Sequence, residues 1–152
     1  TSDVLGGGSS SPLHQVLVKE KKLFSNIECY HFGSVDAGLL TIEGKLVKGV
    51  KMKDAEKAIQ EELNKLQQSV IQERELQKVK NRVESMLAFE DMSLLNRANN
   101  LAFYELLGDA ALMNTEFDNY EAVTTEDIHR EANIIFDEKN SNTIYYYADN
   151  QI

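Results

Sequence analysis

Three histidines are the side chains in this sequence best suited to hold a metal ion. They stand at His14, His31 and His129. A zinc site takes about three or four converging ligands, and helical sites often place two histidines one turn apart. No two of these histidines have that spacing. We therefore predict that the chain holds no structural or catalytic zinc, and that all three are ordinary, partly exposed histidines.

The glycine run Gly6-Gly7-Gly8 is the second candidate for chemistry. Consecutive glycine N–H groups can form a nest that binds a carboxylate or a phosphate. No lysine follows with the spacing of a nucleotide-binding loop, so the pattern disfavours a nucleotide site. We interpret the run first as a flexible connection between two helices, and contact with a substrate is the alternative.

Neither the lone cysteine nor the tyrosine run indicates a reactive group. Cys29 lies in a strand-like stretch, where a buried, small apolar role is favoured over a reactive thiol. A single cysteine also excludes an intramolecular disulfide. The tyrosines at 145–147 favour a strand, with a binding platform as the second interpretation.

The elements that must position these residues follow from hydrophobic periodicity and end signals. Ser11 fits an N-cap whose hydroxyl accepts an early backbone N–H, and Pro12 fits the first helical position. Thr124 begins another helix, with Asp127 completing a weakened capping box. Gly108 is typical of a helix C-cap.

Strands and helices are segregated along the chain. Strands are predicted at 26–34, 38–47 and 143–148, and helices from Ser11, at 53–69, 72–90 and 93–107, near 110–119 and from Thr124. The first two strands should form an antiparallel hairpin. We expect one α+β domain over 1–152, with helices packed on one face of an antiparallel sheet.

Three segments in this order resemble one protein family. The run from Leu5 to Leu23 resembles the LGGGSSSRLYQRLREERGLAYS segment of the pitrilysin/insulinase-type zinc metallopeptidases, the superfamily of the mitochondrial processing peptidase. Residues 73–81 resemble its eELeraKn helix, and residues 123–132 its VTaedv…A helix. The resemblance implies a partial domain, because the family's opening strand–helix–strand third has no counterpart here.

The resemblance also implies that this chain lacks the family's catalytic parts. The missing third carries the HxxEH zinc motif in catalytic halves, so zinc is expected there and no cofactor in this segment. Non-catalytic halves resemble this chain and supply an arginine and a tyrosine that donate hydrogen bonds to the reacting carbonyl. Val18 and Ser25 occupy those two positions here, and neither can take over the role.

Composition narrows the classes of partner. The net charge of −9 argues against non-specific nucleic-acid binding, because polyanions would be repelled. No apolar run is long enough to span a membrane. The compartment stays undecided: a bacterial periplasm or cell envelope is our first expectation, with the cytoplasm as the alternative.

Two functions follow from the resemblance. The first is a non-catalytic half that forms part of a peptide-enclosing chamber and supports an HxxEH-bearing catalytic half or subunit. The alternative is an assembly module of the same fold with no associated peptidase. Three strands would leave unpaired edges. We therefore expect an upstream segment to complete the sheet, or two copies to form a homodimer by edge pairing.

Overall fold

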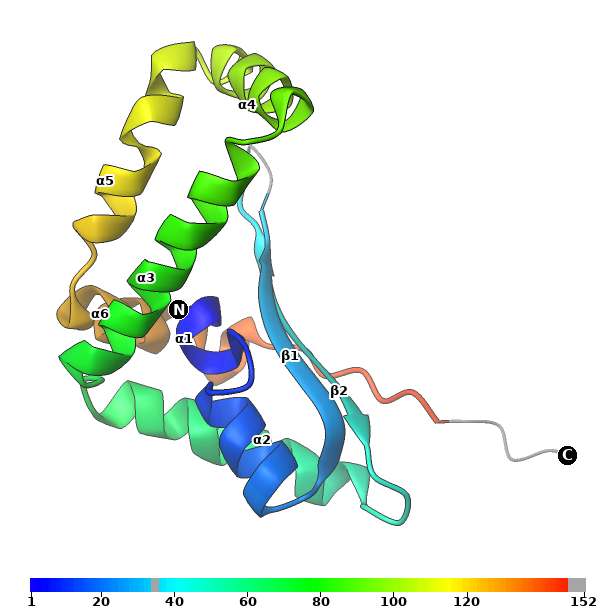
Figure 1. Ribbon diagram of the computed structural model, residues 1–152. Coiled ribbons are helices and arrows are strands. Elements are labelled where there is room, and N and C mark those ends of the chain that lie inside the picture. The colour runs from blue at the N-terminus through cyan, green and yellow to red at the C-terminus, as the bar shows by residue number, and fades with distance from the viewer. Residues whose placement is uncertain (34–35, 148–152) are drawn as a thin grey trace, which may run out of the picture.

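The computed structural model describes residues 1–33 and 36–147. Its helices and its hairpin form a packed body, from which a helical arm extends (Figure 1). The arm is residues 86–121, which run from the last turns of one long helix through three further helices. The rest of the described chain is the body.

The N-terminal part of the body consists of two short helices joined by the glycine run. α1 (Ser2–Gly6) is followed by η1 (Leu13–Glu20), which is a π-helix. The Lys21 N–H donates to the Val16 carbonyl, five residues back, at 2.8 Å. Lys22 then takes a positive φ of 52° and ends the helix. The helix predicted here is therefore present, but with a wider turn than an α-helix.

The predicted capping role of the Ser11 hydroxyl is wrong. η1 has no side-chain cap, and Pro12 takes the cap position in helical geometry. The Ser11 carbonyl accepts from the Gln15 N–H at 2.9 Å. The Ser11 side chain is buried, and its hydroxyl has no hydrogen-bond partner among the described residues. Ser11 therefore lies one residue before the cap position, and its hydroxyl caps no N–H of η1.

The predicted hairpin is confirmed. β1 (Phe24–Phe32) pairs antiparallel with β2 (Leu39–Leu46), with Phe24 opposite Leu46 and Phe32 opposite Leu39. A bulge between Phe24 and Asn26 brings Phe24 onto the buried face, although it lies an odd number of residues from Ile27. α1 and η1 pack against β1, which confirms an α+β fold with helices on one face. Residues 34–35 of the predicted connection lie outside the described residues.

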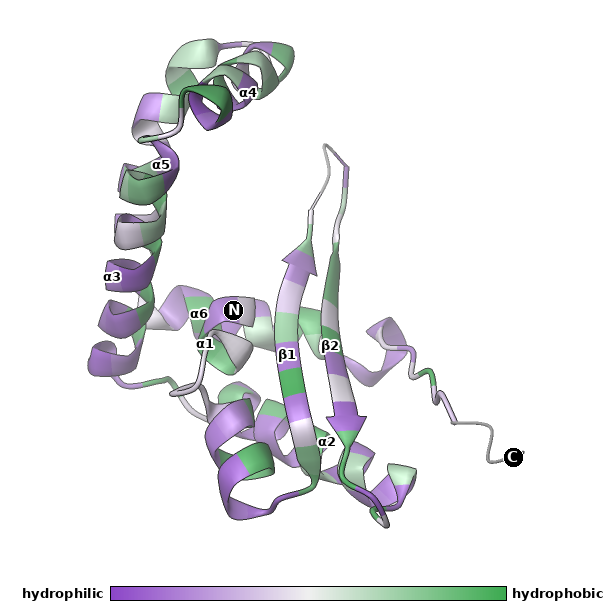
Figure 2. Ribbon diagram, turned by 45° about the vertical axis from the view of Figure 1, so that its right-hand side comes forward, coloured by the Kyte–Doolittle hydropathy of each residue, from purple (hydrophilic) through white to green (hydrophobic). Residues whose placement is uncertain are grey.

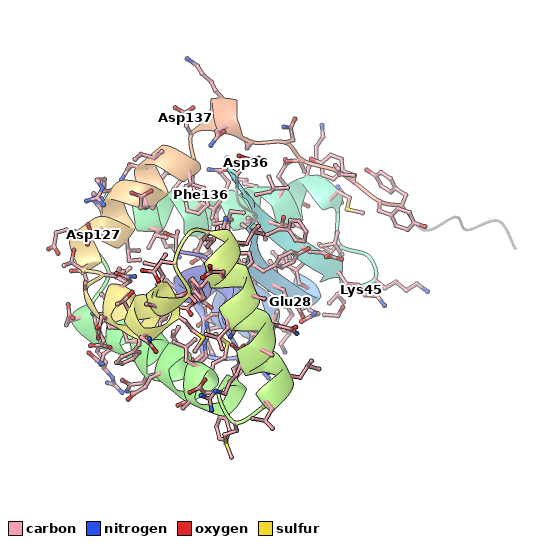
Figure 3. All side chains as sticks on the ribbon, turned by 90° about the horizontal axis from the view of Figure 1, so that it is seen from above. Glu28, Asp36, Lys45, Asp127, Phe136 and Asp137 are labelled. Carbon is pink, nitrogen blue, oxygen red and sulfur yellow. The ribbon has the colours of Figure 1, made fainter. Side chains whose placement is uncertain are left out.

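The amphipathic helices of the body form where periodicity predicts them. They are α2 (Met52–Gln68), the first part of α3 (Glu73–Glu90) and α6 (Thr125–Ile135). The Thr124 hydroxyl accepts from the Asp127 N–H, and the Asp127 carboxylate accepts from the Thr124 N–H, so the capping box is confirmed. Asp127 lies at the outer edge of the molecule, where α6 begins (Figure 3).

The arm contains α4 (Leu94–Leu106), η2 (Ala110–Thr115, a 3₁₀ helix) and α5 (Glu116–Glu121). Gly108 follows α4 with a φ of 117°, as expected of a residue that ends a helix. η2 and α5 together account for the short helix predicted near 110–119. None of these three helices buries a residue.

The predicted last strand is wrong over its described part. After η3 (Glu138–Asn140), residues 143–147 form no strand, and residue 148 lies outside the described residues. Ile144 and Tyr146 are 92% and 86% exposed. Within the described chain no neighbouring strand forms hydrogen bonds with the backbone of this segment. A β-strand is stable only when its backbone pairs with another strand. The Tyr145 hydroxyl instead donates to the Glu56 carboxylate.

Every helix and strand of the body except β2 and η3 contributes at least one buried side chain to the core. Leu5, Leu13 and Leu17 are at most 1% exposed and stand at its centre. Around them lie Val4, Phe24, Ile27, Cys29, Ala55, Ala58, Leu63, Leu66, Leu76, Ile128, Ala132 and Phe136. Among the described residues, none of the helices combines the length and apolar composition needed to cross a bilayer.

Candidate functional site

The glycine run is held tightly between α1 and η1. The Gly7 N–H donates to the Asp3 carbonyl at 3.0 Å, and the Gly8 N–H donates to the Gly6 carbonyl at 2.8 Å. Two of the three glycine N–H groups are therefore already bonded within the chain. This arrangement does not form an anion nest, because a nest needs its N–H groups free to converge on a ligand. Contact of Gly6, Gly7 and Gly8 with a substrate stays a prediction.

Each position of the run requires a glycine for a steric or conformational reason. A Cβ at Gly6 would overlap the Cβ and backbone N of Cys29 on β1. A Cβ at Gly7 would overlap the backbone carbonyl oxygen of Asp3, and also the guanidinium of Arg82 from α3. Gly8 has a φ of 94°, which L-residues rarely adopt. The run thus lets α1 lie directly on β1 and lets Arg82 cover the loop, where it pairs with the Asp3 carboxylate.

A cavity of about 250 Å³ opens beside this loop, between the end of α2 and the start of α3. We call it the loop cavity. Its apolar wall consists of Val4, Leu5, Leu66, Ile71 and Val79.

The charged groups of the loop cavity form pairs. Glu62 contacts the Lys65 ammonium at 2.7 Å, and Glu75 contacts the Lys78 ammonium at 2.6 Å. With the Arg82–Asp3 pair at the same loop, the site carries balanced charge rather than a field that selects one sign of ligand.

Glu62 is the residue of this site that sequence reasoning missed. Its side chain is only 3% exposed, although it lies on a charged, amphipathic helix. The available signal was its spacing. Glu62 follows Ile59 by three residues and precedes Leu66 by four, so it falls on the apolar stripe of α2. The buried Ser11 hydroxyl, which the sequence predicted as a helix cap, lies at the same cavity, so the loop cavity brings it together with Glu62.

The two positions that correspond to the family's helper residues cannot perform that role. Val18 is half-buried in η1 and packs against the core, and its side chain has no donor. Ser25 is exposed at the bulge of β1, and its hydroxyl donates to the Lys45 carbonyl at 3.0 Å. The hydroxyl proton of Ser25 is therefore already donated to Lys45 and is not free to bond a reacting carbonyl.

The three histidines lie on separate elements. His14 is on η1 and His31 is near the tip of β1, whereas His129 on α6 lies with its Nε2 2.9 Å from the Gln67 carbonyl oxygen of α2. Within residues 1–33 and 36–147, no group of three or more His, Cys, Asp or Glu side chains is placed to hold a metal ion. The absence of zinc from this chain remains a prediction.

Cys29 is buried on β1 as a free thiol. Burial raises the pKa of this thiol to about 11. The thiolate is the reactive form of cysteine, so this environment suppresses its nucleophilicity at neutral pH. The geometry therefore fits a packing role beside Gly6.

The chain belongs to the family described as "Peptidase M16 inactive domain", whose model matches residues 1–83. The matched region contains the glycine run, the hairpin, α2 and the packed part of α3. The family is thus the zinc-peptidase superfamily that the sequence resembles, and within it the domain class that does not carry out catalysis. No match is found among curated proteins.

Three solved structures share the fold. A protease from Helicobacter pylori is 25% identical, with a TM-score of 0.80 over 88% of this chain and 32% of its own. A candidate zinc protease from Bordetella pertussis is 20% identical, with a TM-score of 0.79 over 91% of this chain and 76% of its own. The inactive peptidase domain of a candidate zinc protease from Bordetella parapertussis is 20% identical, with a TM-score of 0.78 over 88% and 71%. This chain spans about a third of the Helicobacter pylori protease.

Proposed function

We propose that this chain forms part of the wall of a peptide-enclosing chamber and supports an HxxEH-bearing catalytic half of a zinc peptidase. The observation that carries the proposal is its membership in the inactive-domain family. The substrate would be a peptide, and zinc would belong to the catalytic half. There it would polarise the scissile carbonyl and activate water.

The residues at the two helper positions favour a structural role for this chain over a direct role in the cleavage chemistry. In this chain Val18 packs against the core and the Ser25 hydroxyl is bonded to Lys45. Neither can donate to a developing oxyanion. The contribution of this half to cleavage would therefore come from enclosing the peptide and stabilising its partner.

The alternative function is an assembly module with no peptidase attached. The two functions share a fold and a partner-binding role, and fold alone does not separate them. They differ in one consequence, which is whether adding this chain to an HxxEH-bearing half changes the rate of peptide cleavage.

The test is a complementation assay with an unstructured peptide pool. This chain alone should give no chelator-sensitive cleavage. The matched HxxEH-bearing half should be weakly active alone and clearly more active with this chain. A catalytic half whose motif glutamate is replaced by glutamine is the control and should stay inactive in both mixtures. An unchanged cleavage rate on mixing would contradict the proposal and favour the assembly module.

A homodimer formed by edge pairing is a separate proposal about partners. β1 and β2 make a two-stranded sheet in the described chain, and edges of such a sheet can pair with another strand. Light scattering on residues 1–152 tests this. A monomer that unfolds cooperatively at high concentration would contradict edge pairing.

A further inference from the structure

The arm exposes an unusual amount of apolar surface. Leu94, Met92 and Leu106 are 82%, 78% and 76% exposed. The other large apolar side chains exposed along it are Met86, Phe89, Leu95, Leu101, Phe103, Leu107, Leu112 and Tyr120. Single exposed apolar residues are normal, but a contiguous set on one structural unit marks an interaction surface. Figure 2 shows that the arm extends separately from the hairpin of the body.

The apolar residues of α4 surround more than one face of the helix. At about 100° per residue, Leu94 and Leu101 share one side, Leu95 and Leu106 share a second, and Phe103 lies on a third. A helix that is apolar over most of its circumference is normally buried. Here α4 buries no residue. A partner that covers several faces of one helix must present a folded surface rather than a single extended peptide.

The charge of the arm restricts the partner further. The arm contains one basic residue, Arg97. Its acidic residues are Glu90, Asp91, Glu105, Asp109, Glu116, Asp118 and Glu121. Docking the arm against the arm of a second copy would bring two strongly acidic surfaces together, which Coulomb repulsion opposes. Charge complementarity instead favours a different protein whose docking face is basic at its rim.

We propose that the arm is the surface on which the catalytic half docks, and that the docking face of that half is apolar at its centre with lysines and arginines around it. The identity of the partner rests on the proposed function. The chemistry of its face rests on the arm itself. Apolar contact would supply most of the affinity, and the acidic residues would speed association and fix orientation.

The first test measures binding of this chain to the matched HxxEH-bearing half by calorimetric titration. The double variant Leu95→Glu/Leu106→Glu should weaken binding by at least about tenfold, because it places carboxylates in an apolar contact. The matched control is Phe32→Glu/Leu39→Glu at the hairpin tip, where both side chains are also largely exposed. The control should stay within about twofold of wild type. Neither variant changes a buried residue, so unfolding curves should confirm that both remain folded.

The second test measures the role of charge. Glu90→Lys/Asp118→Lys should slow association with the catalytic half and flatten the salt dependence of binding. The matched control is Glu20→Lys/Glu138→Lys, which makes the same charge change on the body. It should leave the salt dependence close to that of wild type.

Three results would overturn the inference. They are no binding of the wild-type chain, equal binding by the arm variants and wild type, and a homodimer of this chain that the arm variants dissociate. The cleavage assay keeps this inference separate from the proposed function. If the Leu95→Glu/Leu106→Glu variant still restores cleavage fully, the proposed function stands and the docking surface is wrong. If the arm binds the catalytic half and cleavage is unchanged, the docking surface stands and the proposed function is wrong.

Discussion

The two ends of α3 lie in different surroundings, although one continuous helix connects them. Leu76 and Val83, in its first part, are 2% and 4% exposed and meet the body. Met86 and Phe89, in its last turns, are 50% and 73% exposed and belong to the arm. The same apolar periodicity runs through both parts. A sequence pattern therefore specifies the helix and its apolar side, whereas it does not specify what covers that side.

The body and the arm differ in the same way on a larger scale. The body buries the centre of its core completely, as Leu5, Leu13 and Leu17 show. The arm is held by contacts among α4, η2, α5 and α3, and α4, η2 and α5 bury no residue fully. Regions with few buried apolar contacts open at low free energy. We infer that the body supplies most of the stability of the chain and that the arm supplies a binding surface.

The largest expected effect comes from truncating matched leucines in the two regions. Leu17→Ala removes a side chain that is 0% exposed and should lower the free energy of unfolding by about 2–5 kcal/mol. Leu106→Ala removes one that is 76% exposed and should change it by less than about 0.5 kcal/mol. Urea denaturation followed by circular dichroism measures both. Similar losses for the two variants would show that the arm belongs to the cooperative core.

Removing a helix cap should have a smaller effect on the free energy of unfolding, and the loss should differ between the body and the arm. Thr124 caps α6 on the body, and the Ser93 hydroxyl caps α4 in the arm by accepting from the Asn96 N–H at 3.3 Å. Thr124→Ala should lower the free energy of global unfolding by about 1 kcal/mol. Ser93→Ala should lower it by less, because fraying of α4 exposes no buried residue. A larger loss of unfolding free energy for Ser93→Ala than for Thr124→Ala in the same urea titration would contradict the inference that the body supplies most of the stability.

The capping box of α6 also predicts a pH dependence. Hydrogen bonds from the Thr124 hydroxyl and backbone, with help from Arg130, lower the pKa of Asp127 to about 2. A lowered folded-state pKa stabilises the fold above the unfolded pKa of about 4, and this stabilisation is lost as the pH falls towards about 2. The stability advantage of wild type over Asp127→Asn should therefore shrink as the pH falls from about 5 to about 2. A difference that does not change with pH would contradict the capping role.

The smallest expected effect is that of a chelator. The described histidines lie on three separate elements, so no metal should contribute to folding. EDTA should leave the melting temperature of this chain unchanged, and metal analysis after dialysis should find no stoichiometric zinc. Zinc retained at one ion per chain, and lost on replacing two of the histidines by alanine, would contradict this prediction.

Local signals predicted the elements of this fold well. The helices of the body, the hairpin and the Thr124–Asp127 capping box each depend on residues close together in sequence. The strand predicted at 143–148 is wrong over residues 143–147 because a strand needs a partner that the local pattern does not supply. The Ser11 cap failed for a finer reason, since it depended on the residue at which η1 begins.

The candidate site was less accessible to sequence reasoning than the fold. The positions of Val18 and Ser25 came from a resemblance, whereas the glycine run was a candidate because consecutive N–H groups can bind an anion. The structure supplies the steric reasons for Gly6 and Gly7 through Cys29, the Asp3 carbonyl and Arg82. Buried Glu62 could have been found from its place on the apolar stripe of α2. The exposure of the arm could not have been predicted from the sequence. An apolar helical pattern is the same whether the surface that covers it belongs to the same chain or to a partner.

Hydrogen exchange of this chain, alone and with the matched HxxEH-bearing half, tests the central claim most directly. Alone, backbone amides of β1, η1 and α2 should exchange slowly, whereas those of α4, η2 and α5 should exchange quickly. With the catalytic half bound, amides of the arm should slow by about tenfold or more, and those of the body should change little. An arm as protected as the body in the isolated chain, or binding that protects the body and leaves the arm unchanged, would contradict the account.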